Sequence, residues 1–450
     1  MENKKLTEGN ITGTLVKLAI PIMATSFVQM AYNLMDMIWL GRVSTNAVAA
    51  AGTAGFFTWF GSALFMIGKI GAEIGVAQSY GKNNLEAVQK YVNHTIQIDI
   101  IIAVIYSSIL ILFRHEIIGF FNLGNDEVIK MAIDYLVIVS IGMVFYFLNP
   151  VFSGIFNGSG NSTTPFKINA VGLIVNMILD PLMIMGIGPF SKMGIKGAAL
   201  ATIIAQFIVT LIFLKISKDE PKLFSNLNIF KRMDEDYLKN IFKLGLPAAL
   251  QTGIFASIAM IIAKIIAKWG PIPIAVQNVG SQIESISWMT AGGFSTAISA
   301  FIGQNYGAGK WLRIRKGYKK GLMIVGTIGI FATILLMFGA KSIFRLFIPD
   351  DKEAIEVGVR YLKILSLSQF FMTIEIATQG AFYGLGMTFP PALITMVFNS
   401  LRIPFSLILS STSLGLDGIW WSISISSVFK GIILTTWYVL VLRKSPYENL

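Results

Sequence analysis

The sequence of 450 residues contains no cysteine and only two histidines, His94 and His115. Without cysteine the chain forms no disulfide, binds no metal through thiolates and has no cysteine nucleophile. The two histidines lack the spacing of metal ligands, so they give no basis for a zinc site or for imidazole catalysis. The sequence also has no H-E-x-x-H motif, and the motifs of an enzyme are missing altogether. We therefore expect a protein that is not an enzyme and that has no cofactor.

Charge is scarce as well, at 13% of residues, about half the share of an ordinary soluble domain. Apolar residues make up 54% of the chain, and the mean hydropathy is +0.68. This composition excludes a water-soluble enzyme of the same length. The chain has 36 Lys and Arg against 24 Asp and Glu. In a chain embedded in a lipid bilayer this excess is typical of basic cytoplasmic loops, so we expect no nucleic-acid partner.

Long apolar runs account for most of the chain. Because hydrocarbon leaves backbone polar groups without partners, each run must form a helix. The twelve runs lie near 15–40, 47–79, 92–113, 129–152, 163–188, 194–216, 237–268, 272–304, 317–340, 355–384, 389–412 and 416–442. The longest polar stretch between them predicts a linker at 217–236, between an N-terminal lobe at 1–216 and a C-terminal lobe at 237–450. The predicted fold class is thus an all-α integral membrane protein with twelve transmembrane helices.

The two halves repeat each other. A single constant shift along the sequence places Lys17, Leu18 and Pro21 on Lys243, Leu244 and Pro247. The same shift places Gln78-Ser-Tyr-Gly81 on Gln304-Asn-Tyr-Gly307. Because each copy has an even number of spans, both copies enter the membrane from the same side. We therefore expect two six-helix bundles related by a pseudo-two-fold axis along the membrane normal, as in transporters built from parallel repeats.

Basic residues predict the orientation. With the N-terminus inside, the inner loops and helix ends hold 21 Lys and Arg, whereas the outer ones hold 12. This bias predicts that both termini are cytoplasmic, and we expect the protein in the inner (cytoplasmic) membrane of the cell.

Acidic and polar side chains inside the predicted spans are the candidates for function, because burying them in a bilayer is costly. Asp36 lies toward the outer end of the first span, and Asn176 and Asp180 share one face of the fifth. Thr202, in the sixth span, reaches a similar depth at ~12 Å from the outer start of its helix. Carboxylate, amide and hydroxyl oxygens together suit a proton or a sodium ion. In the alternative, a purely structural role, Asp36 caps its helix and Asp180 makes a local hydrogen bond beside Pro181.

The C-terminal half does not repeat these acids and carries other charges within its spans. Glu284, Glu375 and Arg402, together with Gln282, are candidates to line a cavity for a cationic substrate. A buried Glu284–Arg402 pair that only fixes packing is the alternative. Apart from sodium at Asp36, Asn176 and Asp180, the sequence predicts no metal site.

The sequence resembles the multidrug and toxic compound extrusion (MATE) family over nearly its whole length. The resemblance rests on Pro21 with Asp36-Met-Ile-Trp-Leu-Gly41, on the two Gln-x-Tyr-Gly motifs, on Asn176-Met-Ile-Leu-Asp180-Pro181, on Gly194-Ile-Lys-Gly197 through Thr202, and on Gly415-Leu-Asp-Gly418. It implies two lobes around a cleft and export of organic cations, driven by entry of protons or sodium. It also implies that Asp36, Asn176, Asp180 and Thr202 form the cation site of the N-terminal lobe. Some relatives use an acid on the seventh span instead, but Leu246–Lys264 contains none.

The sequence is compatible with two functions. The first is an antiporter that exports small organic cations and acts as a monomer. The second is a flippase or exporter of lipid-linked saccharide precursors, as in relatives with a similar repeat. Such polyanionic substrates call for several cationic side chains, and only Lys69, Arg402 and Lys430 lie within the spans.

Overall fold

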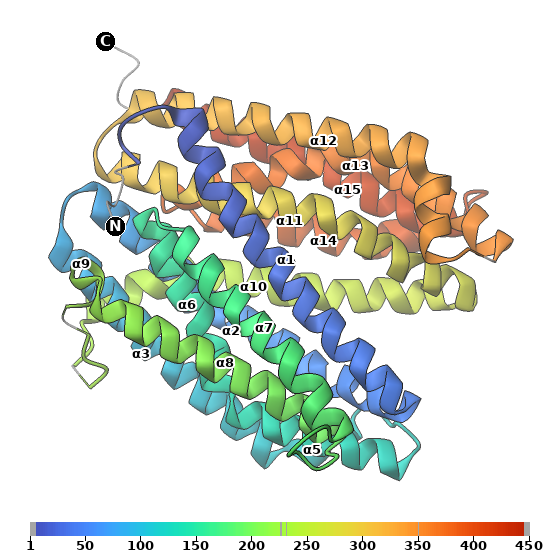
Figure 1. The fold of residues 1–450 in the computed structure, drawn as a ribbon. Helices are drawn as coiled ribbons and strands as arrows, with labels where there is room; N and C mark the ends of the chain where they lie inside the picture. The colour runs from blue at the N-terminus through green and yellow to red at the C-terminus, as the bar shows by residue number, and fades with distance from the viewer. Residues whose placement is uncertain (1–5, 226, 231, 350, 445–450) are drawn as a thin grey trace. The chain divides into compact units, whose positions relative to one another are not determined.

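The computed structural model describes residues 6–225, 227–230, 232–349 and 351–444, which form helices joined by short turns and contain no strand (Figure 1). The helices of the first half are α1 (Ile11–Val43), α2 (Thr45–Gly81), α3 (Leu85–Leu112), α4 (Arg114–Gly119), α5 (Asp126–Ile141), α6 (Met143–Ser159), α7 (Thr163–Met185) and α8 (Ile195–Lys218). The short α9 (Pro221–Phe224) lies in the linker. The second half contains α10 (Glu235–Ala267), α11 (Pro271–Gly307), α12 (Trp311–Phe347), α13 (Lys352–Gly384), α14 (Phe389–Ser410) and α15 (Leu416–Arg443).

Each predicted apolar run corresponds to one long helix, except that the run at 129–152 corresponds to α5 and α6 together. Within the described residues, nine helices are long and apolar enough to cross a membrane, and the bent α5–α6 pair makes a tenth. The remaining two, α11 and α13, are 37 and 33 residues long but more polar, and they carry Glu284 and Glu375. The predicted fold class, an all-α membrane protein, is confirmed.

The sequence repeat is visible in the helices. The α2 and α11 helices each have 37 residues and begin at equivalent positions of the repeat, Thr45 and Pro271. The α8 and α15 helices follow Gly194 and Gly415, which adopt the same backbone conformation, with a positive φ of 53° at both. The copies differ where α5 and α6 meet at Gly142 with a bend of 50°, because the corresponding α13 runs unbroken. Glycine at this position also makes room for Ile203, since a Cβ there would lie 2.5 Å from its side chain.

The chain forms two compact units, and their boundaries do not fall at the linker. One unit contains Ala24–Ala249, and the other contains Leu250 onward together with the segment that ends at Met23. The α1 and α10 helices are therefore each divided between the two units. The predicted lobes, 1–216 and 237–450, followed the order of the sequence and did not include this exchange of segments.

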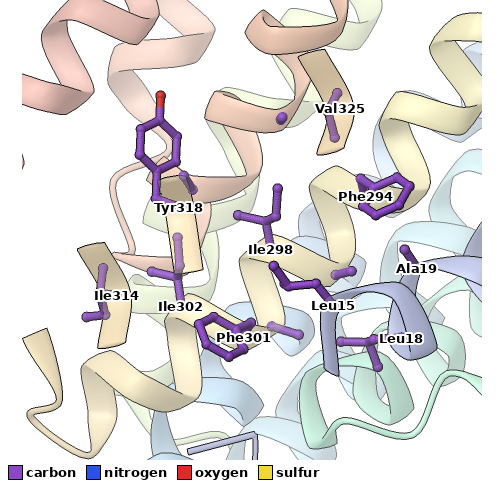
Figure 2. Packing of buried hydrophobic residues seen from close by; sticks show 14 of the residues in the cluster. Leu15, Leu18, Ala19, Phe294, Ile298, Phe301, Ile302, Ile314, Tyr318 and Val325 are labelled. Carbon is purple, nitrogen blue, oxygen red and sulfur yellow. The ribbon is translucent and has the colours of Figure 1, made fainter. Parts of the chain in front are cut away.

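Apolar packing explains why the beginning of α1 belongs with the second half. Leu15, Leu18 and Ala19 are buried against Phe294, Ile298 and Phe301 of α11 (Figure 2). Ile314, Tyr318 and Val325 of α12 complete this cluster. The α12, α13 and α15 helices of this unit lie side by side (Figure 1). Through these contacts the beginning of α1 belongs to the second unit.

The beginning of α10 packs in the corresponding way within the first unit. Ile241 and Ala249 are buried together with Ile67 of α2 and Ile98 of α3. Gly245 is required for this contact, because a Cβ there would lie 2.2 Å from the carbonyl oxygen of Ile67. Two helix backbones can come this close only where one of them has no side chain.

Candidate functional site

A polar cluster forms inside the first unit where α1, α7 and α8 meet. Asp36 is contributed by α1, Asn176 and Asp180 by successive turns of α7, and Thr202 by the third turn of α8. Asn176 and Asp180 are completely buried. The turn between α7 and α8 positions Thr202, because Gly197 lets α8 pack directly on the end of α7. A Cβ at Gly197 would lie 2.5 Å from the carbonyl oxygen of Met183.

Hydrogen bonds join all four predicted side chains. The Asn176 amide Nδ2 donates to Asp36 Oδ1 at 3.3 Å and to Asp180 Oδ1 at 3.1 Å. The Thr202 hydroxyl donates to Asp36 Oδ2 at 3.2 Å. The two carboxyl groups also lie within hydrogen-bonding reach of each other. The structure therefore brings together the four residues that the sequence proposed, on the helices that the sequence proposed.

Two oxygens of this cluster have no hydrogen-bond partner among the described residues. They are Asn176 Oδ1 and Asp180 Oδ2, and both are buried. A buried acceptor without a donor is costly, so it is a natural place for a proton or a cation to bind. Carboxylate and amide oxygens are the ligands that hard cations prefer. In the described part of the chain no three His, Cys, Asp or Glu side chains gather as a metal site would require.

Two tyrosines that the sequence analysis did not assign to the site lie close to it. Tyr32 of α1 and Tyr135 of α5 are both within electrostatic range of Asp36 and Asp180. The buried Tyr32 hydroxyl has no hydrogen-bond partner among the described residues. A signal for Tyr32 was present, because it precedes Asp36 by four residues and so shares its helix face. Tyr135 comes from another helix, and the only sequence signal for it is that the constant shift of the repeat places it on Tyr361.

The charges of the second half form a different arrangement. Lys430 of α15 and Glu375 of α13 make a buried ion pair with an N–O distance of 3.2 Å. Arg402 of α14 donates to the hydroxyls of Ser426 and Ser427 at 2.7 and 3.0 Å. Its guanidinium is within electrostatic range of both Glu375 and Glu284. The simple Glu284–Arg402 pair considered from sequence is thus replaced by a wider network in which Lys430 neutralises Glu375.

Glu284 and Gln282 do not lie together. The Glu284 carboxyl group lies near Tyr361 and Gln369, and its buried Oε1 has no hydrogen-bond partner among the described residues. Gln282 is exposed, on the same face of α11 as the exposed Asn278. Side chains two positions apart on a helix point in different directions, so Gln282 and Glu284 face different sides of α11. That these residues line a cavity for the substrate stays a prediction.

Beside Glu284, three further side chains of the second half form a connected set. The indole nitrogen of Trp420 donates to Gln277 Oε1 at 3.0 Å, and Gln277 Nε2 donates to the Tyr361 hydroxyl at 3.4 Å. Tyr361 occupies in this half the repeat position that Tyr135 occupies in the first. In each half a tyrosine at this repeat position thus lies beside an acid of the predicted spans. The acids come from helices that do not correspond in the repeat.

Comparison with known proteins agrees with this architecture. A family model described as MatE matches residues 21–182 and again residues 247–408. The starts of the two matched segments are related by the same shift that superposes Pro21 on Pro247 in the sequence repeat. Together they span most of the chain.

Similar proteins extend the comparison over the full length. The probable multidrug resistance protein NorM of Thermotoga maritima is 29% identical over 427 residues, covering 93% of this chain and 90% of the relative. A FAD transporter of Shewanella oneidensis is 24% identical over 353 residues, covering 77% and 76% of the two chains. A solved structure described as the outward-facing conformation of a multidrug resistance MATE family transporter is similar in fold. Its TM-score is 0.89 at 22% identity, with 98% of each chain covered.

Proposed function

The chain belongs to the MatE family, and we propose that it exports amphipathic organic cations across the membrane in exchange for protons or sodium ions. The observation that carries the proposal is the cluster of Asp36, Asn176, Asp180 and Thr202. The cluster contains two buried carboxyl groups. Two of its buried oxygens, Asn176 Oδ1 and Asp180 Oδ2, have no hydrogen-bond partner among the described residues. Such intramembrane acids are a feature of ion-coupled transport. The relative from Thermotoga maritima supports export of drugs, because its name is that of a probable multidrug resistance protein.

The coupling follows from electrostatics. When both carboxylates are charged, they repel each other and hold α1 and α7 apart. A proton, or a sodium ion held with Asn176 and Thr202, removes this repulsion and lets the helices pack more closely. The closer packing favours release of the substrate to the outside. Because the ion and the substrate favour different states, each must lower the affinity of the protein for the other.

We also propose a membrane location, an orientation and an oligomeric state for the protein. We place the protein in the inner (cytoplasmic) membrane with both termini in the cytoplasm, since the basic residues concentrate on that side. It acts as a monomer and needs no cofactor besides the coupling ion. Glu284 contributes to substrate selection, because its carboxyl group has a buried Oε1 without a partner among the described residues.

Transport by purified protein in vesicles tests the proposal. Ethidium efflux should follow an imposed gradient of protons or of sodium, and the gradient that drives it identifies the coupling ion. The variants Asp36→Asn and Asp180→Asn should each reduce gradient-driven efflux to the level of empty vesicles. Asp134→Asn is the matched control, because it removes a carboxylate that makes only a partly exposed ion pair with Lys196 at 3.1 Å. The control should transport normally.

Two results would contradict the proposal. Near-normal efflux in both Asp36→Asn and Asp180→Asn would remove the cluster from the coupling mechanism. Uptake of FAD or of a lipid-linked saccharide, with no movement of ethidium, would replace the cationic substrate class by an anionic one. Glu284→Gln should change the relative rates for different cations while gradient coupling persists.

A further inference from the structure

One face of α12 is exposed along almost its whole length. Its exposed apolar side chains are separated by 11, 7, 1, 3 and 4 residues, and at 3.6 residues per turn these spacings keep them on one side of the helix. They are Leu312, Met323, Ile330, Phe331, Ile334 and Phe338, with exposed fractions from 51% to 84%. In a helix that crosses the membrane, an exposed apolar face of this kind contacts lipid tails.

Three lysines continue the same face into the first turns of the helix. Lys316, Lys319 and Lys320 lie between Leu312 and Met323, keep the same spacing and are all exposed. None of the three ammonium groups makes a hydrogen bond or an ion pair with another described residue. Since the apolar stripe begins directly after them, the lysines lie at the level where lipid tails give way to headgroups.

The neighbouring arginines are engaged within the protein, which distinguishes them from the lysines. Arg313 donates to the backbone carbonyls of Leu6, Glu8 and Gly9 at 2.6 to 3.3 Å. Arg315 donates to the carbonyl oxygen of Leu442 at 2.7 Å. These two side chains hold the chain ends against α12. The structural contacts of this region therefore do not use the three lysines.

The repeat supplies an internal comparison. The shift that relates the two halves places Lys316, Lys319 and Lys320 on Lys90, Asn93 and His94 of α3. In α3 the linker covers these positions. Lys90 pairs with Asp234 at 3.8 Å as well as with Glu86, and Asn93 Oδ1 accepts from the backbone of Asn228 at 2.8 Å. His94 Nε2 accepts from the backbone of Asp234 at 3.4 Å.

The N-terminal ends of α3 and α12, which correspond in the repeat, therefore have different surroundings. In the first half the chain itself provides an acid and backbone groups that cover the face. In the second half the corresponding face carries three positive charges, and no described residue covers it. We propose that Lys316, Lys319 and Lys320 bind the phosphate headgroup of an anionic phospholipid whose tails lie along the apolar stripe of α12.

Charge and geometry favour a lipid as the occupant. Clusters of lysine at the end of a membrane helix attract anionic lipid, and each such charge near the membrane surface strengthens binding. The flexible lysine side chains reach toward the headgroup while their methylene stems remain on the apolar face. A soluble anion would contact the lysines alone, whereas a phospholipid held by the lysines also contacts the adjoining Met323 and Ile330 through its tails.

Binding of defined lipids to the full-length protein in a neutral detergent tests the proposal. Native mass spectrometry would compare phosphatidylglycerol with phosphatidylcholine of the same acyl chains. The unaltered protein should bind phosphatidylglycerol more tightly. The triple variant Lys316→Gln, Lys319→Gln, Lys320→Gln should lose roughly 100-fold in this preference, since each lysine contributes roughly fivefold.

Two further triple variants separate a specific site from general charge. Lys268, Lys341 and Lys352 are exposed lysines of the same unit at other helix ends, so changing all three to Gln removes equal charge. This control should retain the preference for phosphatidylglycerol. Changing Lys316, Lys319 and Lys320 to Arg should retain it as well, because the charge remains.

Three outcomes would overturn the proposal. The first is an equal loss of preference in the control variant, which would mean that only net charge matters. The second is an unchanged preference in the Lys316, Lys319, Lys320 glutamine variant. The third is competition by glycerol phosphate at the same concentration as the lipid, which would assign the site to a soluble anion. Melting temperature and gel filtration would establish that the variants compared are folded.

Discussion

The acid cluster of the first half and Glu375 of the second half have different kinds of partners. In the first half, the hydrogen bonds to Asp36 and Asp180 come from the neutral side chains of Asn176 and Thr202. In the second half, Glu375 already has Lys430 as its counterion. An internal ion pair removes the need for an external cation, whereas carboxylates with neutral partners create that need. At this scale the first half is suited to ion coupling.

Thr202 provides a sharp test of the cluster. Thr202→Val keeps the shape of the side chain but removes the hydroxyl that donates to Asp36 Oδ2. A hydrogen bond to a charged group contributes about 1.5 to 3 kcal/mol, so gradient-driven efflux should fall by roughly 10- to 100-fold. Thr202→Ser retains the hydroxyl and should stay within about threefold of the unaltered protein. Equal rates for the Val and Ser variants would exclude a role for this hydroxyl.

The Glu375–Lys430 pair should behave as a structural element. Glu375→Gln leaves a buried ammonium without its counterion, which should lower the free energy of unfolding by about 3 to 5 kcal/mol. Combining Glu375→Gln with Lys430→Met removes both charges and should recover most of that loss. Thermal unfolding in detergent measures both variants. If the double variant is no more stable than the single one, the two side chains do not act as a pair.

At the scale of helices, glycine determines how closely two elements approach. Gly197 and Gly418 occupy the same turn in the two halves, and each lies against the end of the preceding helix. A Cβ at Gly418 would lie 2.5 Å from the backbone of Leu409, as a Cβ at Gly197 would from Met183. Backbone atoms cannot move aside as the end of a side chain can. These glycines therefore fix the packing of α7 on α8 and of α14 on α15.

Replacement of Gly197 by Ala should consequently destabilise the protein. The overpacking should cost about 1 to 3 kcal/mol and displace Thr202 from Asp36, so that efflux falls together with the melting temperature. Gly52→Ala is the control, since Gly52 lies within α2 and a Cβ there would meet no atom within 4 Å. The control should be unchanged or more stable by up to about 1 kcal/mol. A stable Gly197→Ala variant would show that the turn can rearrange.

At the scale of the whole molecule, the exchange of helix segments is the main feature. Each compact unit contains a segment from the other half of the sequence, namely the start of α1 or the start of α10. Leu15 and Leu18 are completely or almost completely buried in the second unit, and Ile241 is completely buried in the first. Neither half of the sequence therefore contains all the residues of one core.

A chain divided after residue 230 tests this exchange. The fragment 1–230 lacks Ile241 and Ala249, and the fragment 231–450 lacks Leu15 and Leu18. Each fragment produced alone should be degraded or aggregate, because it lacks part of its core. Produced together, the two should purify as one complex through a tag on either. Stable, monodisperse fragments obtained separately would contradict the exchange.

The sequence by itself determined the helices, the repeat and the four members of the polar cluster. Helices follow because a bilayer offers backbone groups no other partners. The repeat follows because one constant shift along the chain aligns matching motifs. Asn176 and Asp180 could be assigned to one face from their spacing alone, and the helix lengths placed Asp36 and Thr202 at a similar depth.

Other features were decided only by the tertiary structure. Tyr135 joins the acids, Lys430 pairs with Glu375, and Gln282 lies away from Glu284 because of how each helix is rotated against its neighbours. The exchange of the α1 and α10 segments likewise depends on which apolar surfaces meet. Spacing along a helix specifies which side chains share a face, but the contacts between helices decide what that face touches.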